Sequence, residues 1–514
     1  MKYALGSGQM KAIDRYTIET VGIPSMVLME KAAMAVVRHI KELCSEKDTI
    51  LAVCGYGNNG GDGIAAARIL FMEGYNVAVF MVGDKQNATK ETKQQMKIAK
   101  KIGVPMLRKV KWGEYTVIVD ALFGIGLTRN VAGEFRKVVE SINQSPAKVV
   151  AVDIPSGVCA DDGKVFGIAV AADITVTFGY QKTGCLLFPG SEYAGKVFVE
   201  DIGFAPGGLE EAPTRFYFDE SPAALLPVRQ KNSNKGTYGK VLVIAGSKNM
   251  SGAAYFAATA AYRMGSGLVR ILTAQENREI LQRQIPEAIL TTYETLEDGI
   301  SEKDAESIKE AVSWASVIVL GPGLGMSAMS ARIVNYVICE CKVPLVVDAD
   351  GLNILSRMIS EKVPEEDGVE GRIRYLAELL PKETILTPHK KELSVLTGIP
   401  LADLVACLID SSAPCTYNND LIYVKKDVRT IVSFGNSDYI NVSGNDGMAT
   451  AGSGDVLAGI IAGLLAQGEK PKMAAMAGCF LHGLAGDAAA RKKGPRSMLA
   501  SDILEAIPEI LQEA

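Results

Sequence analysis

The chain has 514 residues, of which 48% are hydrophobic and 22% are charged, a composition that supports large buried cores and excludes a mainly disordered protein. Its 54 Lys and Arg residues are outnumbered by 59 Asp and Glu residues, and the net charge of -5 gives no electrostatic sign of a nucleic-acid or anionic-membrane partner. No apolar run reaches the roughly 18 residues of a membrane-spanning helix, the amino terminus lacks an apolar signal segment, and the nine Cys form no CxxC pair, so we expect a cytoplasmic protein with reduced thiols.

Short β-rich runs alternate with helical patterns along the first part of the chain. Several of these runs are continuously apolar, which is typical of strands covered on both faces, and segments such as 63–73 carry helix formers at helical spacing. The repeated order of strand, helix and strand predicts a parallel sheet with right-handed crossovers. The expected strands are 50–54, 76–82, 116–120, 148–153, 173–178 and 196–201.

A segment rich in Pro, Gly and charged residues, 203–235, interrupts this pattern as a linker between domains would. A second α/β series follows, in which 430–434 is expected to pair with 421–425 as a hairpin and 356–378 is expected to be an exposed insertion. The other expected strands of this series are 240–245, 268–273, 316–321, 343–348 and 384–387. The sequence therefore predicts the α/β class with two domains, 1–215 and 225–514.

A glycine-rich loop, 55–63, follows the first expected strand and precedes a helix. Three of its glycines satisfy the GxGxxG pattern of a dinucleotide-binding loop, although a single match of this kind is weak. Asp62 at the mouth of the helix would repel an incoming pyrophosphate. The amides of Asn58 and Asn59 instead offer neutral contacts to a polar ligand or a cation. An Asp62 that only caps the helix is the alternative.

Two further expected strands end in a carboxylate, Asp120 in TVIVD and Asp153 in VVAVD. Gly124 and Gly126 follow Asp120 and leave backbone groups open to a ligand. In an open parallel sheet the carboxyl ends of the strands line the ligand crevice, so these carboxylates are expected to converge there with Asn59. Each Asp could instead serve a turn, but three polar strand ends in one domain favour a binding site.

The motifs GNNGGDG, VDALFGIGL and VDIPSG together resemble those of the NAD(P)H-hydrate epimerase (YjeF N-terminal) family, over residues 1 to about 215. The resemblance implies a Rossmann-like fold that interconverts the R and S epimers of hydrated NADH or NADPH. It also implies K⁺ bound by Asn59, Asp120 and Ser156, and we expect Asp153 to be the acid/base group. The residues expected to contact the hydrate are Asn58, Asn59, Gly60, Gly61, Asp62, Gly124, Ile125, Gly126, Leu127, Thr128, Arg129, Asn130 and Asp153.

In the second half of the chain, the motif GMATAGSGDVLAG leads from a glycine-rich loop into an apolar helix. The backbone amides of Gly452, Ser453 and Gly454, together with the helix dipole, can stabilise the charge of a phosphate. Asp455 is expected to accept a proton from a hydroxyl that is being phosphorylated. The alternative is an Asp that only caps the helix after a glycine turn.

Other motifs follow strands of the same series and are expected at the same edge of its sheet. GPGLG (321–325) leaves backbone groups exposed, and the two carboxylates of DADGLN (348–353) can reach Mg²⁺ or substrate hydroxyls. TPHKKE is typical of a helix start with Thr387 as its N-cap, which still permits ligand binding by His389. Small residues in 234–269 allow a ligand to approach the backbone closely.

These motifs, in this order, resemble the ADP/ATP-dependent NAD(P)H-hydrate dehydratase (YjeF C-terminal) family of the ribokinase-like superfold, over residues 225–511. The resemblance implies ADP or ATP as co-substrate, Mg²⁺ as cofactor, and a catalytic Asp455. The family often has Lys-Gly where this chain has Lys426-Asp427, which leaves the choice between ADP and ATP open. The residues expected to contact the hydrate are Ala253, Gly323, His389 and Asp455, and those expected to contact the nucleotide are Lys426, Asp427, Val428, Arg429, Thr430 and Gly454.

The preferred interpretation is a repair enzyme with two activities. Residues 1–215 would epimerise R- and S-NAD(P)H hydrate, and residues 225–514 would dehydrate the S form to NAD(P)H, either with ADP, which yields AMP and phosphate, or with ATP. The first alternative is a ribokinase-like small-molecule kinase with an N-terminal nucleotide-binding domain, which would leave a stable phosphorylated product. A binding module without catalytic activity is the second alternative. The sequence leaves the oligomeric state open and allows a homo-oligomer.

Overall fold

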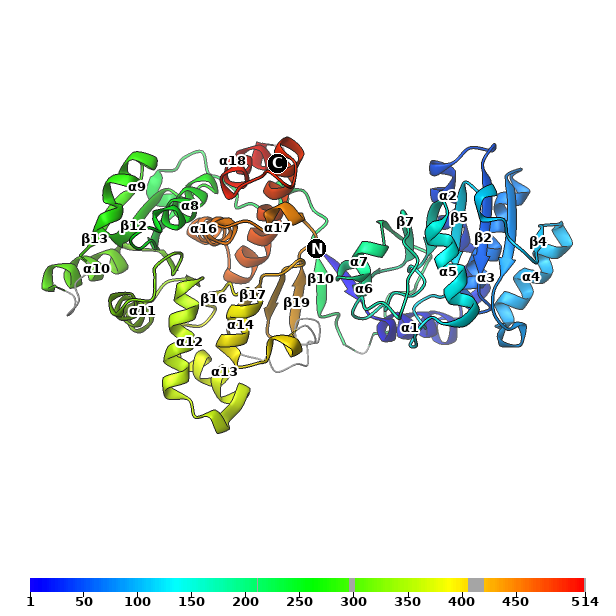
Figure 1. Ribbon diagram of the computed structural model, residues 1–514, viewed down its shortest axis with the longest axis horizontal. Helices are drawn as coiled ribbons and strands as arrows, with labels where there is room; N and C mark the ends of the chain where they lie inside the picture. Colours follow the sequence, from blue (N-terminus) through cyan, green and yellow to red (C-terminus); the bar gives the residue numbers. More distant parts are fainter. Residues whose placement is uncertain (210, 295–300, 405–419, 513–514) are drawn as a thin grey trace. The chain divides into compact units, whose positions relative to one another are not determined.

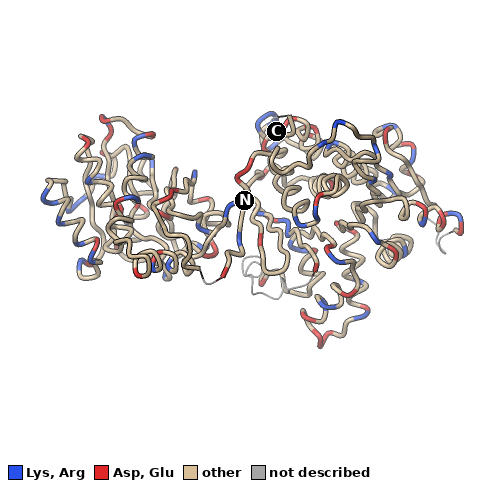
Figure 2. The backbone as a smooth tube through the Cα atoms, turned by 180° about the vertical axis from the view of Figure 1, so that it is seen from behind, with Lys and Arg blue, Asp and Glu red and all other residues tan. Residues whose placement is uncertain are grey.

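The computed structural model describes residues 1–209, 211–294, 301–404 and 420–512. It contains two compact units (Figure 1): the first unit is Tyr3–Arg215, and the second unit is Phe216–Ala514 together with Met1–Lys2. Figure 2 shows acidic and basic residues interspersed along both units, in keeping with the near balance of charge in the sequence. No helix among the described residues has the length and apolar character needed to cross a membrane.

The sheet of the first unit has seven strands in the order β4-β3-β2-β5-β6-β7-β9, and neighbouring strands are parallel. The chain runs outward from β2 in one direction and from β5 in the other, so the order reverses between these two strands, where open α/β sheets bind their ligands. The strands are β2 (Thr49–Cys54), β3 (Asn76–Met81), β4 (Met106–Leu107), β5 (Val117–Ala121), β6 (Lys148–Val152), β7 (Ile174–Phe178) and β9 (Lys196–Glu200).

Helices bury apolar residues on both faces of this sheet. Residues of α2 and α3 share one hydrophobic cluster with the sheet, and residues of α5 share another. Glycine lets α3 lie directly on the strands, because a Cβ at Gly63 would be 2.4 Å from Ala121 Cβ and 2.9 Å from Cys54 Sγ. A short strand, β8 (Gln181–Lys182), pairs with β1 (Lys2–Leu5) in the register Leu5↔Lys182. The helices are α1 (Ser7–Arg15), α2 (Ser25–Leu43), α3 (Asn58–Met72), α4 (Lys90–Ile102), α5 (Gly133–Gln144), α6 (Thr183–Leu186) and α7 (Gly190–Tyr193).

The second unit has a larger sheet, whose strands from β13 to β17 are parallel in the order β13-β12-β11-β14-β15-β16-β17 and whose β18 and β19 continue it in antiparallel pairing. The order reverses between β11 and β14. The strands are β10 (Arg215–Tyr217), β11 (Lys240–Ile244), β12 (Leu268–Ala274), β13 (Ile289–Tyr293), β14 (Val317–Leu320), β15 (Leu345–Val347), β16 (Ile385–Leu386), β17 (Ile422–Lys425), β18 (Ile431–Phe434) and β19 (Ser437–Ile440).

One hydrophobic core of this unit joins alternate strand residues to residues of α8, α16, α17 and α18. α16 is apolar all round and nearly every residue in it is buried, as expected for a helix inside a core. The helices are α8 (Ser251–Arg263), α9 (Arg278–Gln284), α10 (Glu302–Trp314), α11 (Ala328–Glu340), α12 (Asp350–Lys362), α13 (Gly368–Leu379), α14 (Lys390–Thr397), α16 (Ser453–Ala466), α17 (Pro471–Lys493) and α18 (Ala500–Gln512).

The α/β class with two parallel sheets is confirmed, and each strand expected from the sequence is present. The hairpin of β17 and β18 is also confirmed. The expectation of an exposed insertion at 356–378 is only partly right: no residue of 361–370 is buried, but the segment contains the end of α12 and most of α13, with Ile359, Ile373 and Leu376 buried. The run of acidic residues within it dominates the local composition, and the apolar residues at helical spacing on either side of it were therefore overlooked.

Candidate active sites

The first unit contains a cavity of about 960 Å³ that opens at the carboxyl ends of β2, β5 and β6. The loop after β2, the loop after β5 and α1 all contribute to its lining. The structure therefore brings together most of the residues that the sequence predicts to contact the hydrate. Those that line the cavity are Asn58, Asn59, Asp62, Gly124, Ile125, Gly126, Leu127, Thr128, Arg129 and Asp153.

Three of the predicted contact residues lie outside the lining of this cavity. A Cβ at Gly60 would be 1.9 Å from the carbonyl oxygen of Gly55, and one at Gly61 would be 2.6 Å from Met29 Cε. These two glycines therefore permit close packing of α3 and are buried. Asn130 is exposed and lies beyond the loop residues that face the cavity.

Asp153 directly follows β6 and has a left-handed backbone conformation, with φ of 66°. Such a conformation is costly for a residue other than glycine and is common at functional sites. Its carboxylate oxygen Oδ1 is 2.6 Å from Lys182 Nζ and accepts hydrogen bonds from Thr177 Oγ1 and the Phe178 backbone N–H, both at 3.2 Å. The cavity thus contains a carboxylate whose charge is balanced by a buried lysine.

Lys182 is a site residue that the sequence interpretation missed. Its side chain is 1% exposed, and Nζ also donates a hydrogen bond to the Phe178 carbonyl oxygen at 2.8 Å. The residue belongs to the short strand β8, which is held by parallel pairing with β1. A lysine in a two-residue strand carries no pattern of its own, so no local signal could have identified it.

Two more carboxyl groups, those of Asp62 in α3 and Asp14 in α1, line the same cavity. Burial, Asp153 and Asp14 raise the pKa of Asp62 well above its ordinary value. Burial and Asp153 likewise raise the pKa of Asp14. The cavity therefore combines an ion-paired carboxylate with carboxyl groups that tend to hold a proton.

Behind the cavity, Asp120 and Ser156 form a buried cluster of oxygen atoms with the backbone of Phe123. Ser156 Oγ donates to Asp120 Oδ1 at 2.7 Å, and the Ser156 backbone N–H donates to Asp120 Oδ2 at 2.8 Å. The Phe123 carbonyl oxygen accepts from Asn59 Nδ2 at 3.0 Å and from Ser156 Oγ at 3.3 Å. The structure thus brings together the three residues that the sequence predicts to bind a cation.

The charge of this cluster fits a bound cation. Asp120 is fully buried and forms no ion pair with any residue that the structure describes, and burial raises its pKa to about 6. A hard monovalent cation held by carboxylate, hydroxyl, amide and carbonyl oxygens would supply the missing positive charge. In the described part of the chain, no three His, Cys, Asp or Glu side chains are grouped to hold a metal ion.

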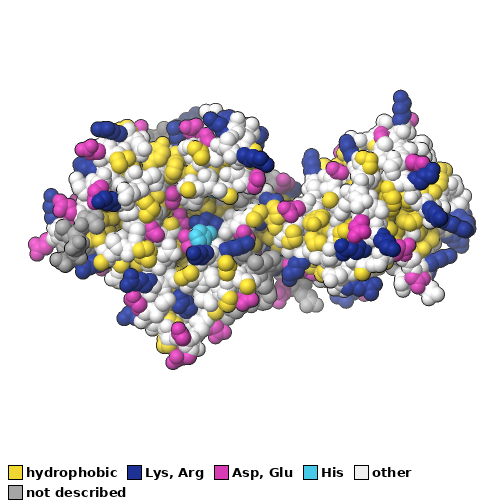
Figure 3. Space-filling view, viewed as in Figure 1, with side chains coloured by type: hydrophobic (Ala, Val, Ile, Leu, Met, Phe, Trp, Pro, Cys, Tyr) yellow, Lys and Arg dark blue, Asp and Glu magenta, His cyan; other side chains and the backbone are white. Residues whose placement is uncertain are grey.

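In the second unit, the GSGD motif forms the amino end of α16. Gly452 precedes the helix with φ of 89°, a conformation that favours glycine. A Cβ at Gly454 would be 3.2 Å from Lys426 Nζ and 3.8 Å from Asp348 Oδ2. The predicted phosphate loop thus lies against a lysine and a carboxylate from two strand ends. Figure 3 shows a hollow in this unit where acidic, basic and histidine side chains meet.

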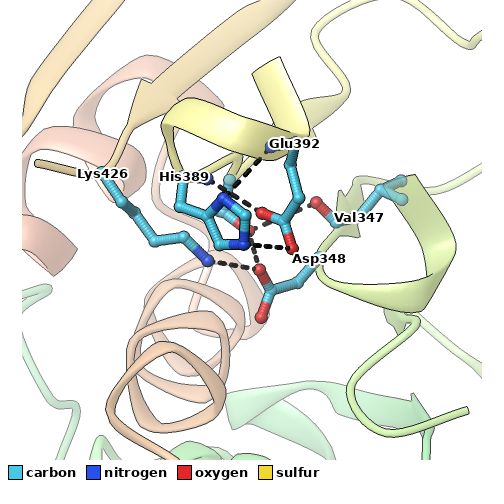
Figure 4. Close-up of polar contacts among 6 residues, drawn as sticks. Val347, Asp348, His389, Glu392 and Lys426 are labelled. Atoms are coloured by element: carbon cyan, nitrogen blue, oxygen red, sulfur yellow. Dashed lines mark hydrogen bonds and ion pairs between the residues drawn. The ribbon is translucent and has the colours of Figure 1, made fainter. Parts of the chain in front are cut away.

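Asp348, at the end of β15, contacts side chains that follow two other strands of this sheet, β16 and β17 (Figure 4). Its Oδ1 is 2.7 Å from Lys426 Nζ and accepts a hydrogen bond from Thr387 Oγ1 at 2.6 Å. Burial disfavours the charge of Lys426, but Asp348, Glu392 and Asp455 outweigh that effect and raise the pKa of Lys426. Thr387 was expected to cap a helix; instead His389 is the N-cap of α14, and Thr387 fixes Asp348.

Asp455 lies in the first turn of α16 and faces this charged group. Burial is the main reason that its pKa is raised to about 7; Asp348 and Asp350 raise it further, whereas Lys426 opposes the shift. A carboxyl group with a pKa near neutrality can accept a proton from a substrate hydroxyl at physiological pH. This environment supports the predicted role of Asp455 as a base.

His389 is 53% exposed, and both of its ring nitrogens face Glu392 (Figure 4). Nδ1 accepts a hydrogen bond from the Glu392 backbone N–H at 3.1 Å, and Nε2 is 3.3 Å from Glu392 Oε1. The His389 backbone N–H donates to Glu392 Oε2 at 2.8 Å. The ring face, more than its nitrogens, is therefore available to a ligand in this arrangement.

The remaining predicted contact residues of the second unit come from α8 and from the loops after β14 and β17. A Cβ at Gly323 would be 2.8 Å from Ala253 Cβ, so these two residues lie side by side. Asp350 Oδ2 accepts a hydrogen bond from the Gly325 backbone N–H at 2.8 Å and thereby fixes the GPGLG loop. In the predicted nucleotide segment 426–430, Asp427 forms an ion pair with Lys390 at 2.7 Å.

Comparison with known proteins places both units in described families. A model of the NAD(P)H-hydrate dehydratase family matches residues 241–509, and a model described as YjeF-related protein N-terminus matches residues 25–184. The chain is 36% identical to the bifunctional NAD(P)H-hydrate repair enzyme Nnr of Thermofilum pendens, over 98% of this chain and 95% of that protein. It is 34% identical to the enzyme of the same name from Moorella thermoacetica, over 99% of this chain and 97% of that protein.

A search of solved structures found the ADP/ATP-dependent NAD(P)H-hydrate dehydratase of Bacillus subtilis, co-crystallised with ATP and Mg²⁺. It is 26% identical to this chain, with a TM-score of 0.46, and the match covers 57% of this chain and 95% of that one.

Proposed function

The chain belongs to the family of bifunctional NAD(P)H-hydrate repair enzymes, and we propose that its two units catalyse different reactions of the repair. The protein is an enzyme that restores NADH and NADPH from their hydrates. The first unit interconverts the R and S hydrates, and the second unit dehydrates the S hydrate with an adenine nucleotide. One observation carries the proposal: in each unit a carboxylate that directly follows a strand of the parallel sheet pairs with a lysine, Asp153 with Lys182 and Asp348 with Lys426.

The proposed epimerisation takes place beside Asp153. The hydrate carries a hydroxyl at C6 of a ring whose nitrogen lone pair can expel it. Loss of water and its return to the opposite face of the ring then invert C6. Asp153 lies in the cavity with Lys182 and two hydrogen-bond donors around its carboxylate, and we propose that this carboxylate accepts the proton of the incoming water.

The proposed K⁺ site consists of Asn59, Asp120 and Ser156, with the Phe123 carbonyl as a further oxygen donor. A cation held there supplies positive charge to a buried carboxylate and fixes the loop after β5, whose residues line the cavity. In this proposal Asp120 is a ligand of the cation and has a structural role, whereas Asp153 accepts and releases the proton.

The proposed dehydration converts a poor leaving group into a good one. Asp455 accepts the proton of the C6 hydroxyl while that oxygen attacks the terminal phosphoryl group of the nucleotide. The rest of the nucleotide, AMP from ADP or ADP from ATP, leaves with the electrons of the broken P–O bond. Phosphate then departs from C6 with its bonding electrons, the ring nitrogen supplies its lone pair, and loss of a neighbouring ring proton restores the dihydronicotinamide. The amides of the Gly452–Gly454 loop and the charge of Lys426 stabilise the transferred phosphoryl group.

The nucleotide is expected to lie along 426–430, with Mg²⁺ to neutralise its phosphates. Asp348 and Asp350 hold Lys426 and the GPGLG loop, respectively, so their first role is to position these groups. The Lys390–Asp427 ion pair neutralises the acidic residue at the position where the family often has Gly. This pairing is compatible with an anionic nucleotide beside it.

Incubation of the protein with mixed R and S hydrates and either ADP or ATP tests the proposal. Release of phosphate in step with recovery of absorbance at about 340 nm, the absorbance of reduced nicotinamide, would support it, as would consumption of both epimers. Consumption of only the S epimer would contradict the role of the first unit. A stable phosphorylated product without recovery of NAD(P)H would instead support the alternative of a small-molecule kinase.

A further inference from the structure

A second carboxyl group in the cavity of the first unit, that of Asp62, is placed differently from Asp153. Asp62 lies in the second turn of α3, between two glycines whose Cβ positions are occupied by neighbouring residues. A Cβ at Gly61 would be 2.6 Å from Met29 Cε, and one at Gly63 would be 2.4 Å from Ala121 Cβ. The helix is therefore closely packed on both sides of Asp62, and this packing fixes where its carboxyl group enters the cavity.

The two carboxyl groups have opposite partners. Asp153 Oδ1 has Lys182 Nζ at 2.6 Å and two further hydrogen-bond donors. Asp62 has no hydrogen bond or ion pair from its side chain to any residue that the structure describes, and the charges that act on it are those of Asp153 and Asp14. Asp153 thus has positive and hydrogen-bonding partners, whereas an ionised Asp62 is repelled by both of its acidic neighbours.

Much of the remaining lining of the cavity is apolar. Residues of α1, α2, β7 and the segment after β9 contribute side chains without charge to the same cavity, which lowers the local polarity that an ionised Asp62 would need. The apolar residues of this lining include Met10, Ile18, Leu28, Met29, Ala32, Phe178, Ile202 and Phe204. Two carboxyl groups in contrasting surroundings are the arrangement that divides the roles of acid and base in enzymes.

We propose that Asp62 is the general acid of epimerisation and that Asp153 is its general base. This inference rests on the proposed epimerase function and deepens it. The Asp62 carboxyl group gives its proton to the C6 hydroxyl oxygen, the C6–O bond breaks with its electrons on oxygen, and water leaves. The ring nitrogen lone pair forms the C=N bond. Water then adds to the opposite face of C6, its proton passes to Asp153, and the lone pair returns to nitrogen; exchange with solvent resets both groups.

Proton transfer by Asp62 depends on the ionisable groups that surround it. Asp14 and Lys11 reach the cavity from α1, Glu91 from α4, and Asp84 from the segment after β3. The others that line it or act on Asp62 are Tyr56, Arg129, Asp153 and Lys182, and Cys54 lies beneath them in β2. Of these groups, Asp153 and Asp14 are the ones that disfavour ionisation of Asp62.

The test is the Asp62→Asn variant of the full chain, assayed by separation of R and S hydrates over a range of pH. Asparagine keeps the shape of the side chain but cannot give up a proton as an acid. We expect the turnover rate of epimerisation to fall on the order of 10²–10⁴-fold, with KM within about threefold of the parent value. Dehydration of the S hydrate by the same protein, in the second unit, should be unchanged and serves as the internal control.

The pH dependence separates a proton donor from a residue that only shapes the cavity. In the parent protein the rate should fall at high pH, as Asp62 loses its proton. Asp62→Glu should keep such a decline at a different pH, and Asp62→Asn should lack it. Asp14→Asn removes a negative neighbour, so it should lower the pKa of Asp62 and move the decline to lower pH.

An Asp62→Asn variant that epimerises at the parent rate, or that shows the same decline at high pH, would overturn the assignment. So would an Asp14→Asn variant whose decline does not move. A parent protein that dehydrates the S hydrate but never converts the R hydrate would instead refute the proposed epimerase function itself, and the two failures are therefore distinguishable.

Discussion

Lys182 Nζ lies 2.6 Å from Asp153 Oδ1, and the two side chains are 1% and 13% exposed, respectively. Removal of one partner from such a pair leaves a charge that is neither solvated nor paired, which is costly in a protein interior. The pair therefore links the stability of the first unit to its proposed chemistry, since the same lysine contacts the carboxylate of the proposed base.

Lys182→Met should lower the free energy of unfolding of the first unit by about 3–5 kcal/mol and abolish epimerisation. Unfolding in urea can be followed by the fluorescence of Trp112 in a Trp314→Phe background, because the chain contains two Trp, one in each unit. The double variant Lys182→Met/Asp153→Asn should regain part of the stability because it buries no unpaired charge. Equal losses in the single and double variants would contradict a coupled pair.

Lys426→Met should move the pH dependence of dehydration to higher pH. Asp455 must be ionised to act as a base, so the rate should rise as pH increases through about 7, the pKa of this residue. Lys426 lowers that pKa, and its removal should raise it further. The matched control is Lys390→Met, which breaks the nearby Lys390–Asp427 pair and should leave the profile in place. An unshifted profile in Lys426→Met would exclude the proposed coupling.

The contribution of His482 to the stability of the second unit should decrease as the pH falls from about 6.5 towards 4. Burial lowers the pKa of His482 to about 4, so between these values the unfolded chain binds a proton that the folded chain does not. The raised pKa of Asp455 acts in the opposite sense, and comparison with His482→Gln isolates the histidine. Urea unfolding followed by Trp314 fluorescence in a Trp112→Phe background should show that the parent loses stability relative to His482→Gln as the pH falls over this range. An identical dependence would mean that His482 is not buried in its neutral form.

Removal of K⁺ should slow epimerisation and leave dehydration unchanged. Without a cation, the buried Asp120 carboxylate lacks a positive partner among the described residues, and the loop after β5 loses its anchor. The measurement is the rate of R-to-S conversion in KCl against tetramethylammonium chloride at equal ionic strength. Asp120→Asn should be insensitive to this exchange, whereas a parent protein equally active in both salts would argue against the cation site.

Much of the two candidate sites could be predicted from the polar residues that directly follow the expected strands. Continuously apolar runs marked the parallel strands, and the carboxylates that follow them, Asp120 and Asp153, lie at the expected edge of the sheet. Lys182 was beyond this reasoning because β8 has two residues and is defined by its pairing with β1 rather than by local pattern. Thr387 was misassigned as a cap because a Thr-Pro sequence before a helix is a common capping pattern, and only the fold reveals that Asp348 lies within its reach.

Helical content was underestimated where charge dominated the local composition. The 356–378 segment contains three consecutive acidic residues, yet the apolar residues on either side pack into the second unit. Burial of residues from α12 and α13 depends on neighbours that are distant in the sequence, such as α14. The position of Asp62 relative to Asp14 and Asp153 depends in the same way on three separate elements.

Each unit is proposed to catalyse one half of the repair reaction, and complementation between two full-length variants tests this division. With ADP and an R/S mixture, Asp153→Asn should release phosphate only up to the initial amount of S hydrate, beyond the slow uncatalysed conversion. Asp455→Asn should interconvert the epimers and release no phosphate. A mixture of the two variants should restore NAD(P)H from both epimers. Full conversion by either variant alone, or no gain on mixing them, would contradict the account.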